Sequence, residues 1–115
     1  MQKKIERGIG MFGDVTFDPG TGKPTQTMQE RLHQIIEQVK LADALGVDLF
    51  AAGEHHRSDY AISSPEILLS ALSTVTSNIK LASGVSVVSS TDPVKLYQDF
   101  ATVDLISNGR AEIIA

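Results

Sequence analysis

Hydrophobic and polar residues follow two different periods along this chain, and together they predict alternating strands and helices. Short runs rich in apolar and β-branched residues are typical of buried strands. These runs cover residues 9–12, 47–53, 79–88 and 110–115. Between them, apolar residues recur every three or four positions, as on one face of a helix. The predicted order is therefore β-α-β-α-β-α-β, which implies parallel strands joined by right-handed helical crossovers.

The three predicted helices have capping residues at their ends. Thr27 and Glu30 form a capping box, and Gly46 follows the first helix. Ser64-Pro65 and Asp92-Pro93 each place an N-cap before a proline at the first helical position. The apolar faces are expected to lie in the core. They comprise Met28, Leu32, Ile35, Ile36, Val39, Ala42 and Leu45 in the first helix, Ile67, Leu68, Ala71, Leu72 and Val75 in the second, and Val94, Tyr97, Phe100, Ala101 and Leu105 in the third.

Two α/β architectures fit this order of elements. One is a small open sheet of four strands, and the other is the N-terminal half of a (β/α)₈ TIM barrel, which needs about 250 residues when complete. The chain has 115 residues, the size of one small domain. No helix is predicted after the last strand, which favours the half barrel. We therefore expect residues 1–115 to form a single partial domain with four parallel strands and three helices.

Composition narrows the class of protein. Hydrophobic residues make up 42% of the chain and charged residues 21%, as in a globular protein. The net charge of −4 argues against a nucleic-acid-binding surface. The absence of cysteine excludes disulfides and thiolate metal sites and fits a reducing compartment, so a cytoplasmic location is expected. No apolar run approaches the roughly 20 residues needed to span a membrane.

The residue types that carry chemistry gather directly after the second predicted strand, in Gly53-Glu54-His55-His56-Arg57. In sheets built from β-α units, ligands bind at the carboxyl ends of the strands. Burying these four polar side chains without hydrogen-bond or ion-pair partners would cost folding free energy. The segment is therefore predicted to form the rim of an active site. Neighbouring residues of an extended segment point to opposite sides, so only one of the two histidines can face a ligand.

Each of these residues also has a purely structural interpretation. His55 could transfer protons or hydrogen-bond the loop backbone. Glu54 could be a general base or the partner of an arginine, and Arg57 could hold a phosphate or carboxylate group or pair with Asp59. Two adjacent histidines beside Glu54 do not converge on one point, and the third, His33, lies in a helix, so no metal site is expected.

Ser83-Gly84-Val85-Ser86 is a second candidate segment, in the third predicted strand. A glycine within a β-branched strand indicates a bulge or the close approach of a flat ligand to the backbone. A steric requirement inside a barrel would explain it equally well.

Four segments in order resemble one family along essentially the whole chain. They are residues 53–57, 63–66, 81–94 and 100–112. In these segments the sequence is similar to the luciferase-like flavin-dependent monooxygenases. Any one of the motifs would be weak evidence, but four in sequence at the family's spacing are specific.

The resemblance implies a TIM barrel that binds reduced FMN noncovalently at the carboxyl ends of its strands. With O₂, such an enzyme oxidises an aldehyde or another small organic substrate, and a flavin reductase supplies the reduced FMN. His55 matches the family's active-site histidine. Ser83, Gly84 and Val85 match the segment against the isoalloxazine ring, where a nonprolyl cis peptide is expected at Gly84-Val85. Glu54, His56 and Arg57 match supporting positions.

The resemblance leaves other functions open. The same fold serves oxidoreductases that use the deazaflavin F420 as hydride carrier, and a noncatalytic flavin-binding or partner subunit is a third possibility. Ser89-Ser90 differs from the Leu-Pro pair of luciferase itself, which argues against light emission. The family's chains continue with four more strands and the flavin phosphate site. We therefore expect a fragment or an obligate homo-oligomer, inactive as 115 residues alone.

Overall fold

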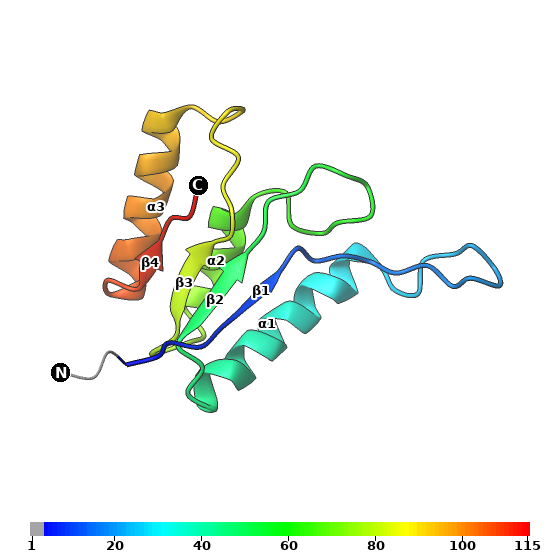
Figure 1. The fold of residues 1–115 in the computed structure, drawn as a ribbon, viewed down its shortest axis with the longest axis horizontal. Helices are drawn as coiled ribbons and strands as arrows, with labels where there is room; N and C mark the ends of the chain where they lie inside the picture. Colours follow the sequence, from blue (N-terminus) through cyan, green and yellow to red (C-terminus); the bar gives the residue numbers. More distant parts are fainter. Residues whose placement is uncertain (1–3) are drawn as a thin grey trace.

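The computed structural model describes residues 4–115 and contains seven elements. The strands are β1 (Gly8–Met11), β2 (Leu49–Ala52), β3 (Lys80–Ser83) and β4 (Ala111–Glu112), and the helices are α1 (Met28–Ala44), α2 (Pro65–Ser73) and α3 (Pro93–Ser107). All neighbouring strands are parallel and lie in the order β1-β2-β3-β4. The helices α1, α2 and α3 flank this sheet in chain order (Figure 1). The predicted fold class and element order are confirmed.

The hydrophobic core lies between one face of the sheet and the three helices. Phe50 and Leu81 are fully buried neighbours in the register of β2 and β3. They pack with buried helix residues, namely Ile35 and Val39 of α1, Leu68, Leu69 and Leu72 of α2, and Phe100 and Val103 of α3. Leu49 and Ala51, which alternate with the buried positions of β2, are only half-buried. Alternation along the strand thus separates a helix-facing side from an open side.

The helix ends follow the predicted capping chemistry. The Thr27 side chain accepts from the Glu30 amide, and the Glu30 side chain accepts from the Thr27 amide, completing the capping box. Gly46 has a φ of 80°, the left-handed conformation that glycine adopts readily. Asp92 caps α3 through the Lys95 amide, whereas Ser64 makes no side-chain cap bond to α2. Within residues 4–115, no helix is long and apolar enough to cross a membrane.

The predicted apolar faces need correction in all three helices. Leu45 is exposed just beyond the end of α1, and Ile67, Ala71 and Val75 lie on the outside. In α3, Val94, Tyr97 and Leu105 are exposed, at 62%, 72% and 81%. The prediction failed because these helices carry apolar residues on both faces, so spacing alone did not identify the buried one. Phe100, Val103 and Ser107 form the buried side of α3.

The amino ends of the strands are joined by side chains that bind backbone groups. Arg110 donates to the carbonyls of Ile79 (2.8 Å), Ser73 (3.0 Å) and Thr76 (3.1 Å). Asp43, near the end of α1, accepts from the amides of Ser77, Asn78 and Ile79 at 2.7–2.9 Å. Arg110 also donates to the Thr76 hydroxyl at 2.9 Å. These two residues therefore connect α1, α2 and the start of β3 mainly through backbone groups.

Burial opposes the ionisation of Asp43, but other contacts outweigh it. The backbone N–H groups of Ser77, Ile79 and Asn78 and the charge of Arg110 favour the carboxylate and lower its pKa below the ordinary value. The ionised form therefore stabilises the fold.

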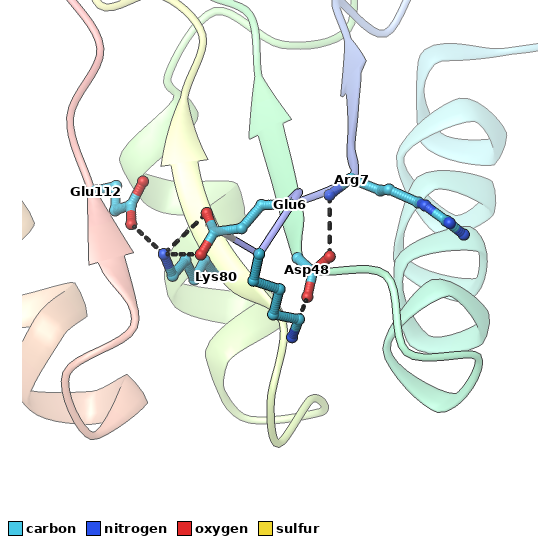
Figure 2. A network of polar contacts seen from close by, with 6 residues as sticks. Glu6, Arg7, Asp48, Lys80 and Glu112 are labelled. Carbon is cyan, nitrogen blue, oxygen red and sulfur yellow. Dashed lines mark hydrogen bonds and ion pairs between the residues drawn. The ribbon is translucent and has the colours of Figure 1, made fainter. Parts of the chain in front are cut away.

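A second charged cluster lies on the open side of the same edge. Lys80 Nζ lies 3.0 Å from Glu6 Oε1 and 3.2 Å from Glu112 Oε1, so the ammonium stands between two carboxylates (Figure 2). Its hydrogen bond to Glu6 is the main cause that raises the pKa of Lys80, followed by the bond to Glu112. The Asp48 carboxylate accepts from the Arg7 amide, while the Arg7 side chain points away (Figure 2).

Candidate functional site

Close packing of an aromatic ring on a glycine joins the carboxyl ends of β1 and β2. Gly53 directly follows β2, and a Cβ atom added there would lie 2.4 Å from the Phe12 ring. Only glycine therefore lets the ring rest on this backbone. The Gly53 amide donates to the Met11 carbonyl at 2.8 Å, which continues the β1–β2 pairing into the rim. Phe12 is thereby placed beside the segment that carries the histidines.

His55 lies within an aromatic cluster. Its ring stacks on Tyr60 with centroids 4.2 Å apart and an interplanar angle of 23°. The Phe12 ring meets His55 edge-on at 6.0 Å and Tyr60 edge-on at 6.3 Å. The His55 amide also donates to the Ile62 carbonyl at 2.9 Å, so backbone and ring are both fixed. This geometry holds the imidazole by packing, and none of the hydrogen bonds found within residues 4–115 involves its ring nitrogens.

His56 has different surroundings, as strand alternation predicts. Its Nε2 atom lies 2.6 Å from Glu54 Oε1, and its side chain is 60% exposed. Glu54 is only 9% exposed and also contacts a different strand, because its Oε2 accepts from the Val87 amide at 2.8 Å. Glu54 thus connects the end of β2 to the segment after β3.

The segment after β3 leaves regular strand geometry earlier than predicted. β3 ends at Ser83, and the Gly84-Val85 peptide bond is cis, as expected at that position. A Cβ at Gly84 would lie 2.7 Å from the Ala51 Cβ, so close packing of β2 on β3 requires glycine here. This contact gives the glycine the steric role that remained open from the sequence.

Ser83 and Val85 occupy different environments on this segment. Ser83 is buried, and its hydroxyl contacts the Ile114 carbonyl and amide at 3.2 and 3.1 Å. Val85 is 44% exposed at the rim. The assignment of Ser83, Gly84 and Val85 to cofactor binding stays a prediction.

Arg57 is held on the outside of the cluster. Its guanidinium donates to Asp59 at 2.8 Å and lies 5.4 Å from the centre of the Tyr60 ring. The pairing with Asp59 was one of the two alternatives from the sequence. An exposed arginine in this position adds a positive charge to the rim and supports the aromatic ring that carries His55.

The rim also offers apolar surface and one unused polar group. Phe12, Val85 and Val88 are all about half exposed. The Ser86 hydroxyl is buried and has no hydrogen-bond partner among residues 4–115. Buried polar groups normally have a partner. The half-exposed apolar side chains offer contact to a flat ring, whereas the Ser86 hydroxyl is not accessible from the surface. In the same range, no three His, Asp or Glu side chains are grouped as a metal site would require.

Two residues of this cluster, Phe12 and Tyr60, were absent from the predicted site. Phe12 was the last residue of a predicted strand, and Tyr60 fell between the second predicted strand and the second predicted helix. Phe12 did carry a signal, because it is an aromatic residue directly after the carboxyl end of β1, where barrel sites are built. Tyr60 lies eight residues after β2, in the loop that leads to α2, so its position gave a weaker one. The contact of Glu54 with Val87 could not be foreseen, since it joins a side chain to a backbone amide 33 positions away.

Comparison with known proteins identifies relatives of this chain. Residues 11–115 match the family described as luciferase-like monooxygenases. The oxygenase component of the flavin-dependent trigonelline monooxygenase of Acinetobacter baylyi is 33% identical over 89 residues, which are 76% of this chain and 25% of that protein. The chain therefore spans about a quarter of the length of this curated relative.

Solved structures agree with the fold. The crystal structure of apo-MsnO8 superposes with a TM-score of 0.83 and 27% identity, covering 96% of this chain and 32% of the other. The F420-dependent tetrahydromethanopterin reductase of Methanopyrus kandleri superposes with a TM-score of 0.73 and 23% identity, covering 96% of this chain and 26% of that one. The latter likeness concerns the fold alone, so the fold does not distinguish between cofactors.

Proposed function

This chain belongs to the luciferase-like monooxygenase family, and we propose that it supplies the histidine-bearing part of a flavin-dependent monooxygenase site. The cofactor would be reduced FMN, bound noncovalently at the carboxyl ends of the strands. The co-substrate would be O₂, and the substrate a small organic molecule. A separate reductase would supply the reduced flavin, a partner that suits an enzyme related to an oxygenase component.

The observation that carries this proposal is the position of His55. Its ring is fixed by Tyr60 and Phe12 at the same edge of the sheet as Gly84 and Val85. Ligands of β-α sheets bind at this edge. A histidine held by stacking can exchange a proton with a bound ligand without first leaving a hydrogen-bonded partner.

The surrounding residues suit a flavin ring. When bound, reduced flavin supplies the electrons that activate O₂. Phe12, Val85 and Val88 would exclude water from one side of the ring. Glu54, His56 and Arg57 hold the segments of the rim in place and, in this proposal, do not transfer protons.

The test uses the intact protein that carries this sequence. Binding of reduced FMN and reduced F420 is compared anaerobically, and O₂ consumption is then followed with candidate substrates. We expect a preference for FMN, and a decrease in kcat of about 100-fold or more in His55→Ala, the usual effect of removing a group that transfers protons. His33→Ala, an exposed helix position, is the matched control.

Three results would contradict the proposal. Preference for F420 would assign a hydride-transfer enzyme of the same fold. Flavin binding without O₂ consumption under any substrate would indicate a noncatalytic subunit. Unchanged turnover in His55→Ala would remove His55 from the chemistry.

A further inference from the structure

Glu54 is the one charged side chain of the predicted rim that is almost fully buried, at 9% exposure. Burial of a carboxylate is costly unless its oxygens are hydrogen-bonded. Here both oxygens are engaged, Oε1 with His56 Nε2 at 2.6 Å and Oε2 with the Val87 amide at 2.8 Å. A carboxylate with both oxygens occupied is poorly placed to take a proton from a substrate. Its contacts indicate a different role.

The backbone of Glu54 holds the same segment a second time. Its amide donates to the Val85 carbonyl at 3.3 Å. Glu54 therefore makes hydrogen bonds to both Val85 and Val87, one through its backbone and one through its side chain. The other fixed points are the Gly84 amide, which donates to the Ala52 carbonyl, and the Ser86 amide, which donates to the Ile114 carbonyl. Among the hydrogen bonds described for residues 84–87, Glu54 provides the only one from an acidic side chain.

The contacts of Glu54 with the 85–87 segment matter because of where Glu54 lies in the sequence. Glu54 directly precedes His55, while Val85 lies on the exposed rim. One residue therefore fixes the two parts of the site, the histidine and the 85–87 segment, relative to each other. His56 closes the arrangement from the solvent side by holding the second carboxylate oxygen.

We propose that Glu54 is a positioning residue that locks the 85–87 segment against β2 and thereby sets the affinity of the site for its flat cofactor. The effect on affinity rests on the proposed function, both for the identity of that cofactor and for its place beside the 85–87 segment. The hydrogen bonds between Glu54 and the 85–87 segment, which we call the lock, are present in the protein without ligand. A bond from an amide to a buried carboxylate is stronger than one between neutral groups, so its removal should loosen the segment measurably.

The experiment compares Glu54→Ala, Glu54→Gln and His56→Ala in the intact protein. Amide hydrogen exchange at Val87, read by NMR without cofactor, reports on the lock. The dissociation constant of reduced FMN and kcat at saturating flavin report on its consequence. Glu37→Ala, which removes an exposed carboxylate that pairs with Lys40, is the matched control.

We expect Glu54→Ala to speed exchange at Val87 about 10- to 100-fold, the range for losing a hydrogen bond to a charged group. The flavin dissociation constant should rise by a similar factor, while kcat at saturation changes less than about threefold. Glu54→Gln keeps an oxygen that can accept from the Val87 amide, so the exchange rate at Val87 and the flavin dissociation constant should rise much less. His56→Ala should have an intermediate effect, because it frees the other oxygen.

Three outcomes separate the lock from the proposed function. Unchanged exchange at Val87 in Glu54→Ala would overturn the lock. Faster exchange with unchanged flavin affinity would overturn its effect on the cofactor. Failure of the unmodified protein to bind reduced FMN would refute the proposed function and this cofactor effect, while exchange at Val87 would still decide whether the lock exists.

Discussion

The amino ends of the strands (the amino edge of the sheet) and their carboxyl ends (the carboxyl edge) differ in how their polar groups are satisfied. At the amino ends of the strands, Arg110 and Asp43 bind the backbone of the loops that they join. At the carboxyl ends, Phe12 and Val85 are half exposed, and the buried Ser86 hydroxyl has no partner among the described residues. The backbone groups at the amino ends are thus bound by charged side chains, whereas the carboxyl ends expose apolar side chains, where we propose that the cofactor binds. The division agrees with the general rule that barrels keep stability at one end and chemistry at the other.

This contrast predicts that substitutions at the two edges have different consequences. Changes at the amino edge should lower the free energy of unfolding and leave the chemistry intact in the molecules that fold. Changes at the carboxyl edge should alter binding or turnover at little cost in stability. The variants below test that division.

The largest effect on stability is expected from Arg110→Ala. The substitution leaves the carbonyls of Ser73, Thr76 and Ile79 without their donor. We expect a loss of about 2–4 kcal/mol, measured by urea unfolding, because several partly buried acceptors lose a charged partner at once. Arg7→Ala is the control, since that side chain is exposed and points away from Asp48 (Figure 2), and it should cost less than about 0.5 kcal/mol. Equal losses in the two variants would refute the role given to Arg110.

A smaller loss is expected from Asp43→Ala. Three amides at the start of β3 lose their acceptor but can turn partly to water, so we expect about 1–2 kcal/mol in the same assay. Glu37→Ala, on the same helix, should have almost no effect.

The contribution of Asp43 should also depend on pH in a defined direction. Its pKa is lower in the folded chain than in the unfolded one, so the stabilisation is complete above the unfolded pKa of about 3.9. It is then lost as the pH falls through the folded pKa. The difference in unfolding free energy between the natural chain and Asp43→Ala should therefore shrink in acid below about pH 4. A difference that stays constant from pH 7 to pH 3 would contradict this explanation.

At the carboxyl edge, Tyr60→Leu should affect function more than stability. Leucine retains apolar bulk but removes the stack on His55 and the contact with Arg57. Aromatic pairs contribute about 0.5–1.5 kcal/mol, so the unfolding free energy should fall by about 1 kcal/mol. Turnover of the intact protein should decrease about three- to tenfold because the His55 ring is less well held. Unchanged turnover with a large loss of stability would place Tyr60 with the structural residues instead.

The smallest effect is expected from Lys80→Met. Lys80 contacts Glu6 and Glu112, but all three side chains are at least one-third exposed, and such ion pairs contribute little. The urea midpoint of the 115-residue chain should remain within experimental error, with no difference between low and high salt. A clear, salt-sensitive loss would show that the amino edge also depends on its surface charges.

Local signals in the sequence predicted most of the fold. The capping box at Thr27 and Glu30, the left-handed Gly46 and the Asp92-Pro93 start of α3 each act within a few residues, so the sequence records them directly. The buried faces of α2 and α3 were harder to predict, because Ile67 and Tyr97 continue apolar patterns on the exposed side. Tertiary packing determines which face is buried, and the spacing of apolar residues along a helix does not reveal it.

The site was predictable only where residue type and strand position coincide. His55, Gly84 and Val85 lie at the expected edge for that reason. The roles of Arg110 and Asp43 were missed because their partners are backbone atoms, which look alike at every position of a sequence. The same reason hid the contact of Glu54 with Val87.

The most direct test of the account is to map reduced FMN on the intact protein by NMR under anaerobic conditions. Chemical shift changes should concentrate at the methyl groups of Val85 and Val88, at the His55 ring and at the amides of residues 84–87. Signals of Asp43, Lys80 and Arg110, at the opposite edge, should not move. Shifts centred on the amino edge or on the outer face of α1, or no shifts at saturating flavin, would contradict the assignment of the carboxyl edge as the cofactor site.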